Sequence, residues 1–296
     1  NRMKKALLVV NPSSGGEQAQ EYEKLAHQKL TTMFDEVVVL HTKKAGDAKN
    51  FTREAAVDRY HSVFVMGGDG TVNEGINGIA EQAHRPNFGF IPLGTVNDLA
   101  RALGIPLEPE EAIAHLSMDA LQPLDIGKIN DQYFMNVVAI GTIPESINDV
   151  DPEKKTKYGK FAYFISGIKQ LAGTQSYKFQ LVIDGQEKQI ESSTLLVGLT
   201  NSIGGFETLI PNAKVNDGKL HLVYLKDTSL LDTLKTLPDL LKGVDSSTDH
   251  LAYQTCETIQ IALDEDQELA TNVDGDEGVK LPVTLKVLPS HLMIYC

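Results

Sequence analysis

The feature that most constrains the fold is the alternation of two patterns over the first 120 or so residues. Near-continuous apolar runs, "ALLVVN", "EVVVL", "SVFVM" and "FGFIPL", alternate with helical patterns such as "EQAQEYEKLAHQKL" and "DAKNFTREAAVDRY". A run without polar alternation is typical of a parallel strand buried on both faces. Strands joined through helices form parallel sheets with right-handed crossovers. The pattern predicts a doubly wound α/β domain.

The alternation of strand and helix patterns ends at about Pro123. Short strand patterns follow, among them "KINDQYFMNVVAIG", "YKFQLVIDGQEKQIESSTLLVGLT", "GKLHLVYLK", "ETIQIAL" and "VTLKVL", separated by Asp-Gly and similar turns. This is typical of an antiparallel, sandwich-like sheet pair. Helical patterns interrupt it near Phe161–Leu171 and Leu230–Leu241. We expect an α/β domain over residues 3–123 and a β-rich domain over 124–289, with 290–296 returning to the first domain as a strand.

Charge and hydropathy narrow the function classes. The net charge is −13, from 40 acidic against 27 basic side chains, which argues against a nucleic-acid binder. No apolar run approaches the roughly 18 residues that a spanning helix needs. Two cysteines are too few for a disulfide framework, so a reducing cytoplasm fits best. The basic run Glu153–Lys160 reads as a solvated helix start more readily than as a lipid-headgroup patch.

The candidate ligand-binding motifs of the first half of the chain lie at the carboxyl ends of the predicted strands. "VVNPSSGG", "VMGGDGT" and "IPLGTVND" each run from a strand into a loop and then a helix. In open α/β sheets the carboxyl edge of the strands is where ligands bind. Three such loops would converge on one edge.

The loop Gly67–Thr71 looks suited to phosphate. Its glycines let several backbone N–H groups approach one anion, and the helix that opens at Thr71 adds its partial positive charge. An acid there, Asp69, would repel phosphate unless a cation such as Mg²⁺ stood between them. The helix presents one apolar face and one polar face; these are Val72, Ile76 and Ile79 against Asn73 and Asn77. The alternative is a tight Asp-Gly turn without a ligand.

The loop in "IPLGTVND" has the same order of features, a glycine turn followed by a helical pattern. Gly94-Thr95 makes a turn, and a helix follows with its apolar face on one side and its polar residues on another; these are Val96, Leu99, Ala100 and Leu103 against Asn97, Asp98 and Arg101. Alternatively, Thr95 only caps that helix.

The second half offers two acidic turns, Asp217-Gly218 and Asp274-Gly275-Asp276. The later one is not a calcium loop, because Glu277 stands where the glycine belongs and Val283 where the bidentate glutamate belongs. Both suit hairpin turns, and spacing alone favours that reading for Asp217. The eight histidines show no metal-like spacing.

"GGDGTVNEGINGI" together with "PLGTVNDLARALGIP" resembles the diacylglycerol kinase catalytic-domain family, especially its soluble bacterial lipid kinases. GGDGT alone is shared with NAD kinases and 6-phosphofructokinase-like enzymes. The resemblance covers essentially the whole chain, through "VVNPSSGG", "KKTKYGKFAYFISGIKQL", "PNAKVNDGKLHLVYL" and "TNVDGDEG".

The resemblance implies a nucleotide-binding α/β domain and a β-rich domain, with ATP and a lipid substrate in the cleft between them. The residues it places around ATP are Asn11, Ser13, Ser14, Gly15, Gly16, Thr42, Gly67, Gly68, Asp69, Gly70, Thr71, Val72, Asn73, Gly94, Thr95 and Asn97. It places Mg²⁺ on Asp217 and the carbonyls of Lys214 and Lys219, joined through water by Asp69 and Asp98.

Relatives usually carry Asp-Gly-Glu in the late loop, and one of those acids serves as the base. Here Asp274 is favoured as the catalytic base, and Asp276, one methylene shorter than the usual glutamate, is the second candidate. The acceptor implied is diacylglycerol, giving phosphatidic acid. Alternatives are another lipid alcohol (phosphatidylglycerol, a long-chain base or undecaprenol), an NAD kinase-like activity, or a non-catalytic nucleotide-binding regulator. A lipid acceptor further suggests transient contact with the inner face of the membrane. The charge balance argues against nucleic acid as a partner, and a homodimer is one option.

Overall fold

The computed structural model describes residues 2–141, 175–202, 210–226, 243–248, 251–264 and 266–296. It divides into two compact units: unit 1 is Asn1–Ile126 with Leu288–Cys296, and unit 2 is Gly127–Val287. The boundaries expected from the sequence fall at 123/124 and 289/290. The basic run at 153–160 and the helical patterns near 161–171 and 230–241 lie outside the described residues.

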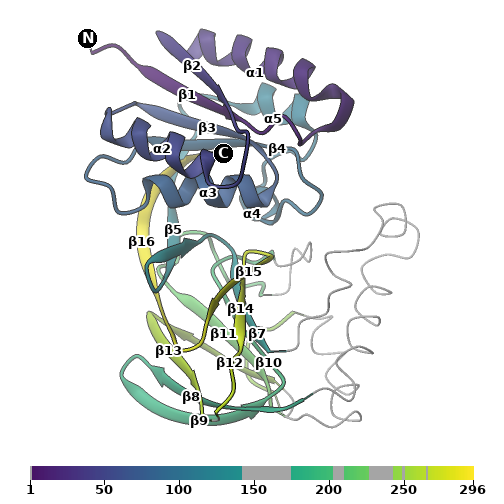
Figure 1. Cartoon of the computed structure of the whole chain (residues 1–296), viewed down its shortest axis with the longest axis vertical. Helices are drawn as coiled ribbons and strands as arrows, with labels where there is room; N and C mark the ends of the chain where they lie inside the picture. The colour runs from purple at the N-terminus through teal and green to yellow at the C-terminus, as the bar shows by residue number, and fades with distance from the viewer. Residues whose placement is uncertain (1, 142–174, 203–209, 227–242, 249–250, 265) are drawn as a thin grey trace. The chain divides into compact units, whose positions relative to one another are not determined.

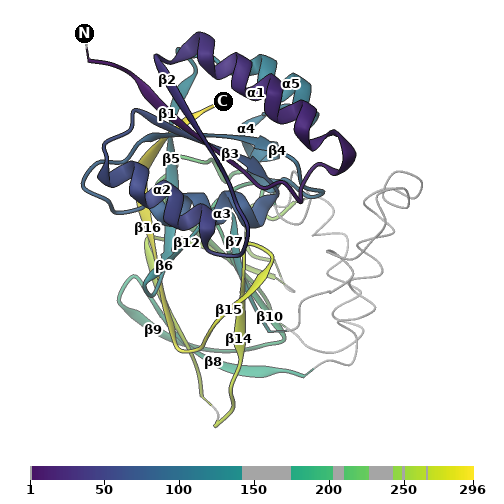
Figure 2. The same ribbon diagram turned by 45° about the horizontal axis from the view of Figure 1, so that its top comes forward.

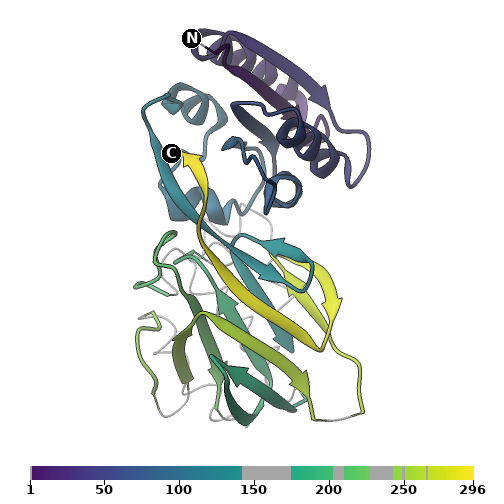
Figure 3. The ribbon, with the colours of Figure 1, turned by 90° about the vertical axis from the view of Figure 1, so that its left-hand side faces the viewer.

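Unit 1 is built on a parallel sheet, as predicted. Its strands β1 (Lys5–Val10), β2 (Glu36–His41), β3 (Ser62–Gly67) and β4 (Asn87–Pro92) lie in the order β2-β1-β3-β4. Every residue of β3 is buried, as a central strand covered on both faces requires. The last strand of the chain, β16 (Val283–Tyr295), joins this sheet beside β4, where Ile294 pairs with Phe88 in parallel. Figure 3 shows β16 in yellow as one long strand that ends near the C terminus.

Helices cover both faces of this sheet (Figure 1). On one face lie α1 (Ala19–Met33), preceded by the short 3-10 helix η1 (Gly16–Gln18), and α5 (Pro109–His115). On the other face α2 (Asp47–Val57) and α3 (Asp69–Ile79) lie side by side (Figure 2). Their close packing needs a glycine: a Cβ at Gly78 would lie 2.0 Å from Thr52 Oγ1.

Helix α4 (Asp98–Leu103) is shorter than the sequence pattern suggests. Asn97 has a left-handed backbone (φ 53°), so the helix begins after it and Val96 is not helical. The expectation that Asn97 and Asp98 project away from the buried face is therefore wrong. Their exposed fractions are 6 % and 7 %, whereas Leu103 is only half-buried.

Unit 2 is a two-sheet, antiparallel sandwich in its described residues. One sheet has the order β12-β11-β10-β7-β14-β15. Its strands are β7 (Val137–Gly141), β10 (Thr194–Gly198), β11 (Leu220–Leu225), β12 (Leu251–Cys256), β14 (Ala270–Val273) and β15 (Asp276–Lys280). The other sheet holds β8 (Tyr177–Ile183), β9 (Gln186–Ser192), β13 (Thr258–Leu263), the first half of β16, and β5 (Leu121–Ile129) with β6 (Gln132–Phe134).

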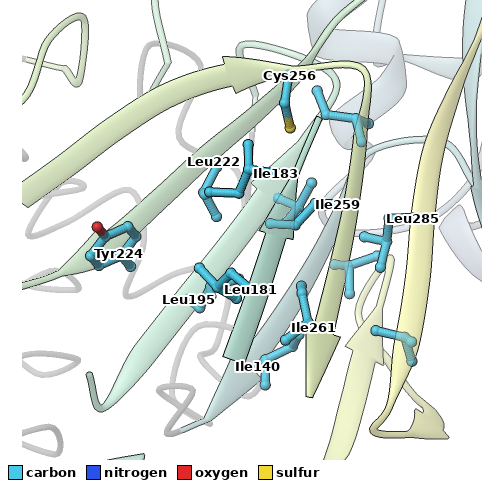
Figure 4. Close-up of a cluster of buried hydrophobic side chains, with 14 of the residues drawn as sticks. Ile140, Leu181, Ile183, Leu195, Leu222, Tyr224, Cys256, Ile259, Ile261 and Leu285 are labelled. Carbon is cyan, nitrogen blue, oxygen red and sulfur yellow. The ribbon is translucent and has the colours of Figure 1, made fainter. Parts of the chain in front are cut away.

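The core of unit 2 lies between these two sheets. Figure 4 shows the apolar cluster, to which Leu195 and Leu222 contribute from one sheet and Leu181 and Ile261 from the other. All four are at most 1 % exposed. The fold class is confirmed: a parallel α/β unit and an antiparallel β-sandwich-like unit. Among the described helices, none has the length and apolar character that a bilayer crossing requires.

Candidate active site

The loops after β1 and β3 meet in unit 1. Asn11 follows β1, and its side-chain amide donates a hydrogen bond of 3.1 Å to Thr71 Oγ1 in the first turn of α3. Its backbone N–H donates to Met66 O at 3.0 Å, which continues the pairing of β1 with β3. Asn11 Oδ1 in turn accepts bonds from the backbone N–H and hydroxyl of Ser13. Asn11 therefore ties the Ser-Ser-Gly-Gly loop to the start of α3.

The loops after β3 and β4 meet through two glycines. A Cβ built on Gly94 would lie 2.8 Å from Gly68 Cα, which is a backbone atom that no side-chain movement can relieve. The backbone of the strands stays paired up to this point, since Leu93 N–H donates to Gly67 O at 2.9 Å. Only glycine permits this approach, so the glycines of GGDGT and LGTVND fix one loop against the other.

The remaining residues predicted around the nucleotide lie on the same edge of unit 1. Ser14, Gly15 and Gly16 continue the loop after β1, and both glycines have positive φ. Thr42 follows β2, and its N–H donates to Val10 O at 2.9 Å. Thr95 is exposed in the loop after β4. The predicted convergence of loops at the carboxyl ends of parallel strands is thus what unit 1 has.

The first turn of α3 gives this edge its chemistry. The helix begins at Asp69, two residues before the predicted Thr71, and Val72 N–H is bonded back to Gly68 O at 3.1 Å. The first turn, Asp69, Gly70 and Thr71, therefore directs its N–H groups toward the loop edge, where the helix dipole favours an anion. Asn73, predicted to cradle phosphate, is half-buried and accepts hydrogen bonds from Asn77.

One carboxylate, Asp69, lies in this first turn, and a second, Asp98, is the first residue of α4. Asp69 is half-buried and Asp98 is buried. Asn97, also buried, donates a side-chain bond of 2.8 Å to Gly94 O and so holds the LGTVND loop in its bent form. The result is an edge that offers N–H donors for an anion and acidic side chains for a cation.

Asp217 lies in unit 2, in the loop before β11. Its Oδ2 accepts the N–H of Lys214 at 3.1 Å and a ring N–H of His221 at 2.8 Å, and its Oδ1 accepts the N–H of Lys219 at 3.0 Å. Burial alone would raise the pKa of Asp217, but the hydrogen bonds from His221 and the two lysine amides outweigh it and bring the pKa below its ordinary value. The carboxylate is thus ionised and held in one orientation.

The residues around Asp217 fit the Mg²⁺ that the family resemblance implies. A carboxylate oxygen and backbone carbonyls are the hard oxygen donors that Mg²⁺ prefers. Among the described residues, the N–H of Lys219 is the one donor to Oδ1, so this oxygen has a second lone-pair position for a ligand bond. No group of three or more His, Cys, Asp or Glu side chains with ligand geometry occurs within the described residues. A site here would therefore use the carbonyls of Lys214 and Lys219 and water, as the sequence analysis expects.

Sequence reasoning missed two side chains beside Asp217. His221 is 2 % exposed and lies between the Asp217 carboxylate and the hydroxyl of Tyr253, whose oxygen is 2.7 Å from its Nδ1. The histidines had no metal-like spacing, which hid this one. The available signal was the spacing of Asp217 and His221, four residues apart across the start of a strand.

Asp274 occupies the turn of the β14–β15 hairpin. Asp274 and Gly275 both have positive φ (51° and 98°), as in the two-residue hairpin turns that Asp-Gly favours. The Asp274 carboxylate accepts three backbone N–H bonds from residues 135, 136 and 137, at 2.8, 2.8 and 3.0 Å. Both of its oxygens therefore hold the start of β7 in place.

Asp276 is the first residue of β15 and pairs with Val273 across the turn. Unlike the half-buried Asp274, it is exposed. The hairpin therefore carries one acid that is bonded to the fold and a second that faces solvent.

The whole chain matches known protein families. Residues 5–129 match the model of the diacylglycerol kinase catalytic domain. Residues 137–296 match the YegS C-terminal NAD kinase beta sandwich-like domain. The two matches contain all the loops described above.

Full-length relatives agree with these matches. The chain is 38 % identical over 293 residues to a Streptococcus pneumoniae protein provisionally named a lipid kinase, covering 99 % of this chain and 98 % of that protein. It is 36 % identical over 293 residues to the diacylglycerol kinase of Bacillus subtilis, covering 99 % and 96 %. A Bacillus anthracis crystal structure, provisionally titled a diacylglycerol kinase, superposes with a TM-score of 0.85 at 30 % identity, covering 100 % of this chain and 97 % of that one. The chain belongs to the bacterial diacylglycerol kinase family of lipid kinases.

Proposed function

We propose that this chain transfers the γ-phosphoryl group of ATP to the primary hydroxyl of diacylglycerol, with Mg²⁺, to give phosphatidic acid. The observation that carries the proposal is the junction of Gly68 and Gly94 at the start of α3, inside the region that matches the kinase domain. Phosphoryl transfer depends on positioning and on neutralising charge, and a glycine-built edge of N–H groups supplies both.

In this proposal unit 1 binds the triphosphate. The N–H groups of Asp69, Gly70 and Thr71 contact phosphate oxygens, and the neighbouring loops complete the nucleotide site. The Asn11 side chain holds Thr71 in place through its hydrogen bond to Thr71 Oγ1. Donors already in place need little reorganisation as charge develops on the transferring group.

Unit 2 supplies the cation and the base. In unit 2, Asp217 and the backbone carbonyls of Lys214 and Lys219 would hold Mg²⁺, whose chemistry when bound would be to neutralise charge on phosphate oxygens. The lipid hydroxyl forms its bond to the γ-phosphorus as the bond to the leaving ADP oxygen breaks. Its proton goes to a carboxylate.

We assign that carboxylate to Asp276, which revises the preference for Asp274. A general base has to reach the acceptor, and three backbone N–H bonds hold the Asp274 carboxylate against the start of β7. Asp276 is exposed at the adjacent position, and Asp274 acts by holding the turn that presents it.

The names of the relatives differ in how closely they define the acceptor. The Bacillus subtilis relative is named a diacylglycerol kinase, whereas the Streptococcus pneumoniae relative carries only a lipid kinase name. Another lipid alcohol is therefore the second candidate. A lipid acceptor also implies transient contact with a membrane surface, on the cytoplasmic side where ATP is available.

The test is a comparison of acceptors with radiolabelled ATP and Mg²⁺. Mixed micelles would carry diacylglycerol, phosphatidylglycerol, a long-chain base or undecaprenol, and NAD would be offered in parallel. Thin-layer chromatography is expected to show labelled phosphatidic acid as the fastest-forming product. Label in another lipid would move the assignment to that alcohol. Label in NAD alone, or nucleotide binding without transfer to any acceptor, would overturn the proposal.

A further inference from the structure

The loop that carries Asp217 is backed by a buried pair of polar side chains. His221 is the second residue of β11, a strand whose six residues are all buried. Tyr253 lies diagonally across on the neighbouring strand β12, two residues from Thr255, which is the direct partner of His221. The two rings stack with centroids 6.0 Å apart. A histidine placed among apolar strand residues needs a partner for each nitrogen, and here it has both.

The hydrogen-bond direction along this pair follows from chemistry. An ionised carboxylate only accepts, so His221 Nε2 must carry the proton that it shares with Asp217 Oδ2 at 2.8 Å. The Tyr253 hydroxyl oxygen lies 2.7 Å from Nδ1, so the second ring nitrogen is also hydrogen-bonded. Burial, together with the charges of Asp217 and Asp245, raises the pKa of Tyr253, so its hydroxyl stays protonated near neutral pH.

The consequence falls on the two oxygens of Asp217. Each carboxylate oxygen offers about two lone-pair positions. Oδ2 accepts two hydrogen bonds, from the Lys214 N–H and from His221, whereas Oδ1 accepts one, from the Lys219 N–H. Within the part of the chain that the structure describes, one lone-pair position on Oδ1 therefore has no protein donor.

We propose that His221 and Tyr253 are positioning residues that make Asp217 a one-oxygen ligand for a divalent cation through Oδ1. This inference rests on the proposed role of Asp217 in metal binding. It goes further by naming what orients the ligand and which oxygen it uses. A histidine that orients a ligating carboxylate acts from outside the metal's own ligands, and loss of such a partner typically weakens metal affinity by about 10–100-fold.

The test measures Mn²⁺ binding to the whole chain without substrate, from the electron paramagnetic resonance signal of free Mn²⁺. Wild type is expected to show a site that Asp217→Ala abolishes. His221→Leu removes the donor and should weaken that site by about 10–100-fold. His221→Gln, whose amide nitrogen reaches a position close to Nε2, should restore most of the affinity.

Tyr253→Phe gives a second test of Mn²⁺ affinity that does not require the protein to fold with a substituted His221. It removes only a hydroxyl, so the strand pair should stay folded while Mn²⁺ affinity falls by a smaller factor. Tyr224→Phe is the matched control, since Tyr224 lies on β11 outside this pair and should leave Mn²⁺ binding unchanged. Equal affinity in His221→Leu, Tyr253→Phe and wild type would overturn the inference alone. No Asp217-dependent Mn²⁺ site in wild type would overturn it together with the metal site on which it rests.

Discussion

Two Asp-Gly hairpin turns in the described part of unit 2 have the same geometry, Asp184-Gly185 between β8 and β9 and Asp274-Gly275 between β14 and β15. All four residues have positive φ, at 47° and 83° in the first turn and 51° and 98° in the second. In each turn the aspartate N–H donates to a carbonyl of a third strand, at 3.0 Å and 2.9 Å. In each, the carboxylate accepts N–H groups from the start of that strand.

The difference between the turns lies in the next residue and in one extra bond. Gln186 follows the first turn and Asp276 follows the second. The Asp184 bonds both end on Oδ1, whereas Asp274 also takes the N–H of Met135 on Oδ2. Because both turns have this arrangement, an aspartate whose carboxylate accepts backbone N–H groups serves the structure of the turn and not the chemistry. What sets the second turn apart chemically is the exposed acid that comes after it.

The largest expected effect separates Asp276 from the rest of its hairpin. Asp276→Asn removes the proposed base and should lower kcat by about 10²–10⁴-fold, the range that general base catalysis supplies. Because Asp276 is exposed, the thermal melting temperature should not change. Glu277→Gln, at the adjacent exposed acid, is the matched control and should keep wild-type kcat. A kcat within a few fold of wild type for Asp276→Asn would remove the distinction between the two turns.

The second prediction compares the two turn aspartates by stability. In Asp274→Asn an amide nitrogen replaces Oδ2 and faces the Met135 N–H, so the free energy of unfolding should fall by about 1–3 kcal/mol. In Asp184→Asn both bonds can remain on Oδ1, and the loss should be about 0.5–1 kcal/mol. Urea unfolding of the two variants measures the difference. Equal losses would mean that the third bond of Asp274 adds nothing.

The third prediction concerns the turn glycines. A Cβ would meet nothing within 4 Å at Gly185 or Gly275, so the cost of Gly→Ala comes from the left-handed backbone alone. Each substitution should lower the free energy of unfolding by about 1–2 kcal/mol. Only Gly275→Ala, which lies between Asp274 and Asp276, should also reduce phosphoryl transfer at full folding. Equal activity in the two variants would show that the geometry of the second turn does not matter to the reaction.

The smallest effect concerns a thiol near the first turn. Burial, with a smaller contribution from the charge of Asp184, raises the pKa of Cys256 to about 12. The thiol is therefore neutral at pH 8, and the folded protein should resist alkylation there by iodoacetamide. Asp184→Asn removes only the smaller contribution and should change the labelling rate little. Mass spectrometry of labelled peptides checks both statements, and rapid labelling of Cys256 in the folded wild type would contradict them.

The sequence predicted the parallel sheet and its loop edge well, because buried parallel strands and glycine turns are local signals. Its errors have physical causes. The apolar spacing from Val96 to Leu103 resembles a helix face, but the left-handed backbone at Asn97 starts α4 later. Strand β12 was missed because "LAYQTC" carries polar residues among apolar ones.

The site was harder to predict where it depends on distant partners. Nothing local to Asp274 indicates that its oxygens meet backbone N–H groups at residues 135–137. The same holds for His221, whose role depends on a tyrosine from another strand. The sequence therefore identified the acidic residues but did not indicate which of them are structural and which are candidates for catalysis.

The central claim is that the chain passes phosphate from ATP to a lipid hydroxyl with help from a divalent cation. The most direct measurement is the initial rate of label transfer from ATP to diacylglycerol in mixed micelles, with Mg²⁺, after EDTA, and after Mg²⁺ is restored. The account predicts labelled phosphatidic acid that falls to background with EDTA and returns with Mg²⁺. A lipid fraction that stays unlabelled with Mg²⁺ present, or a rate that EDTA does not change, would contradict it.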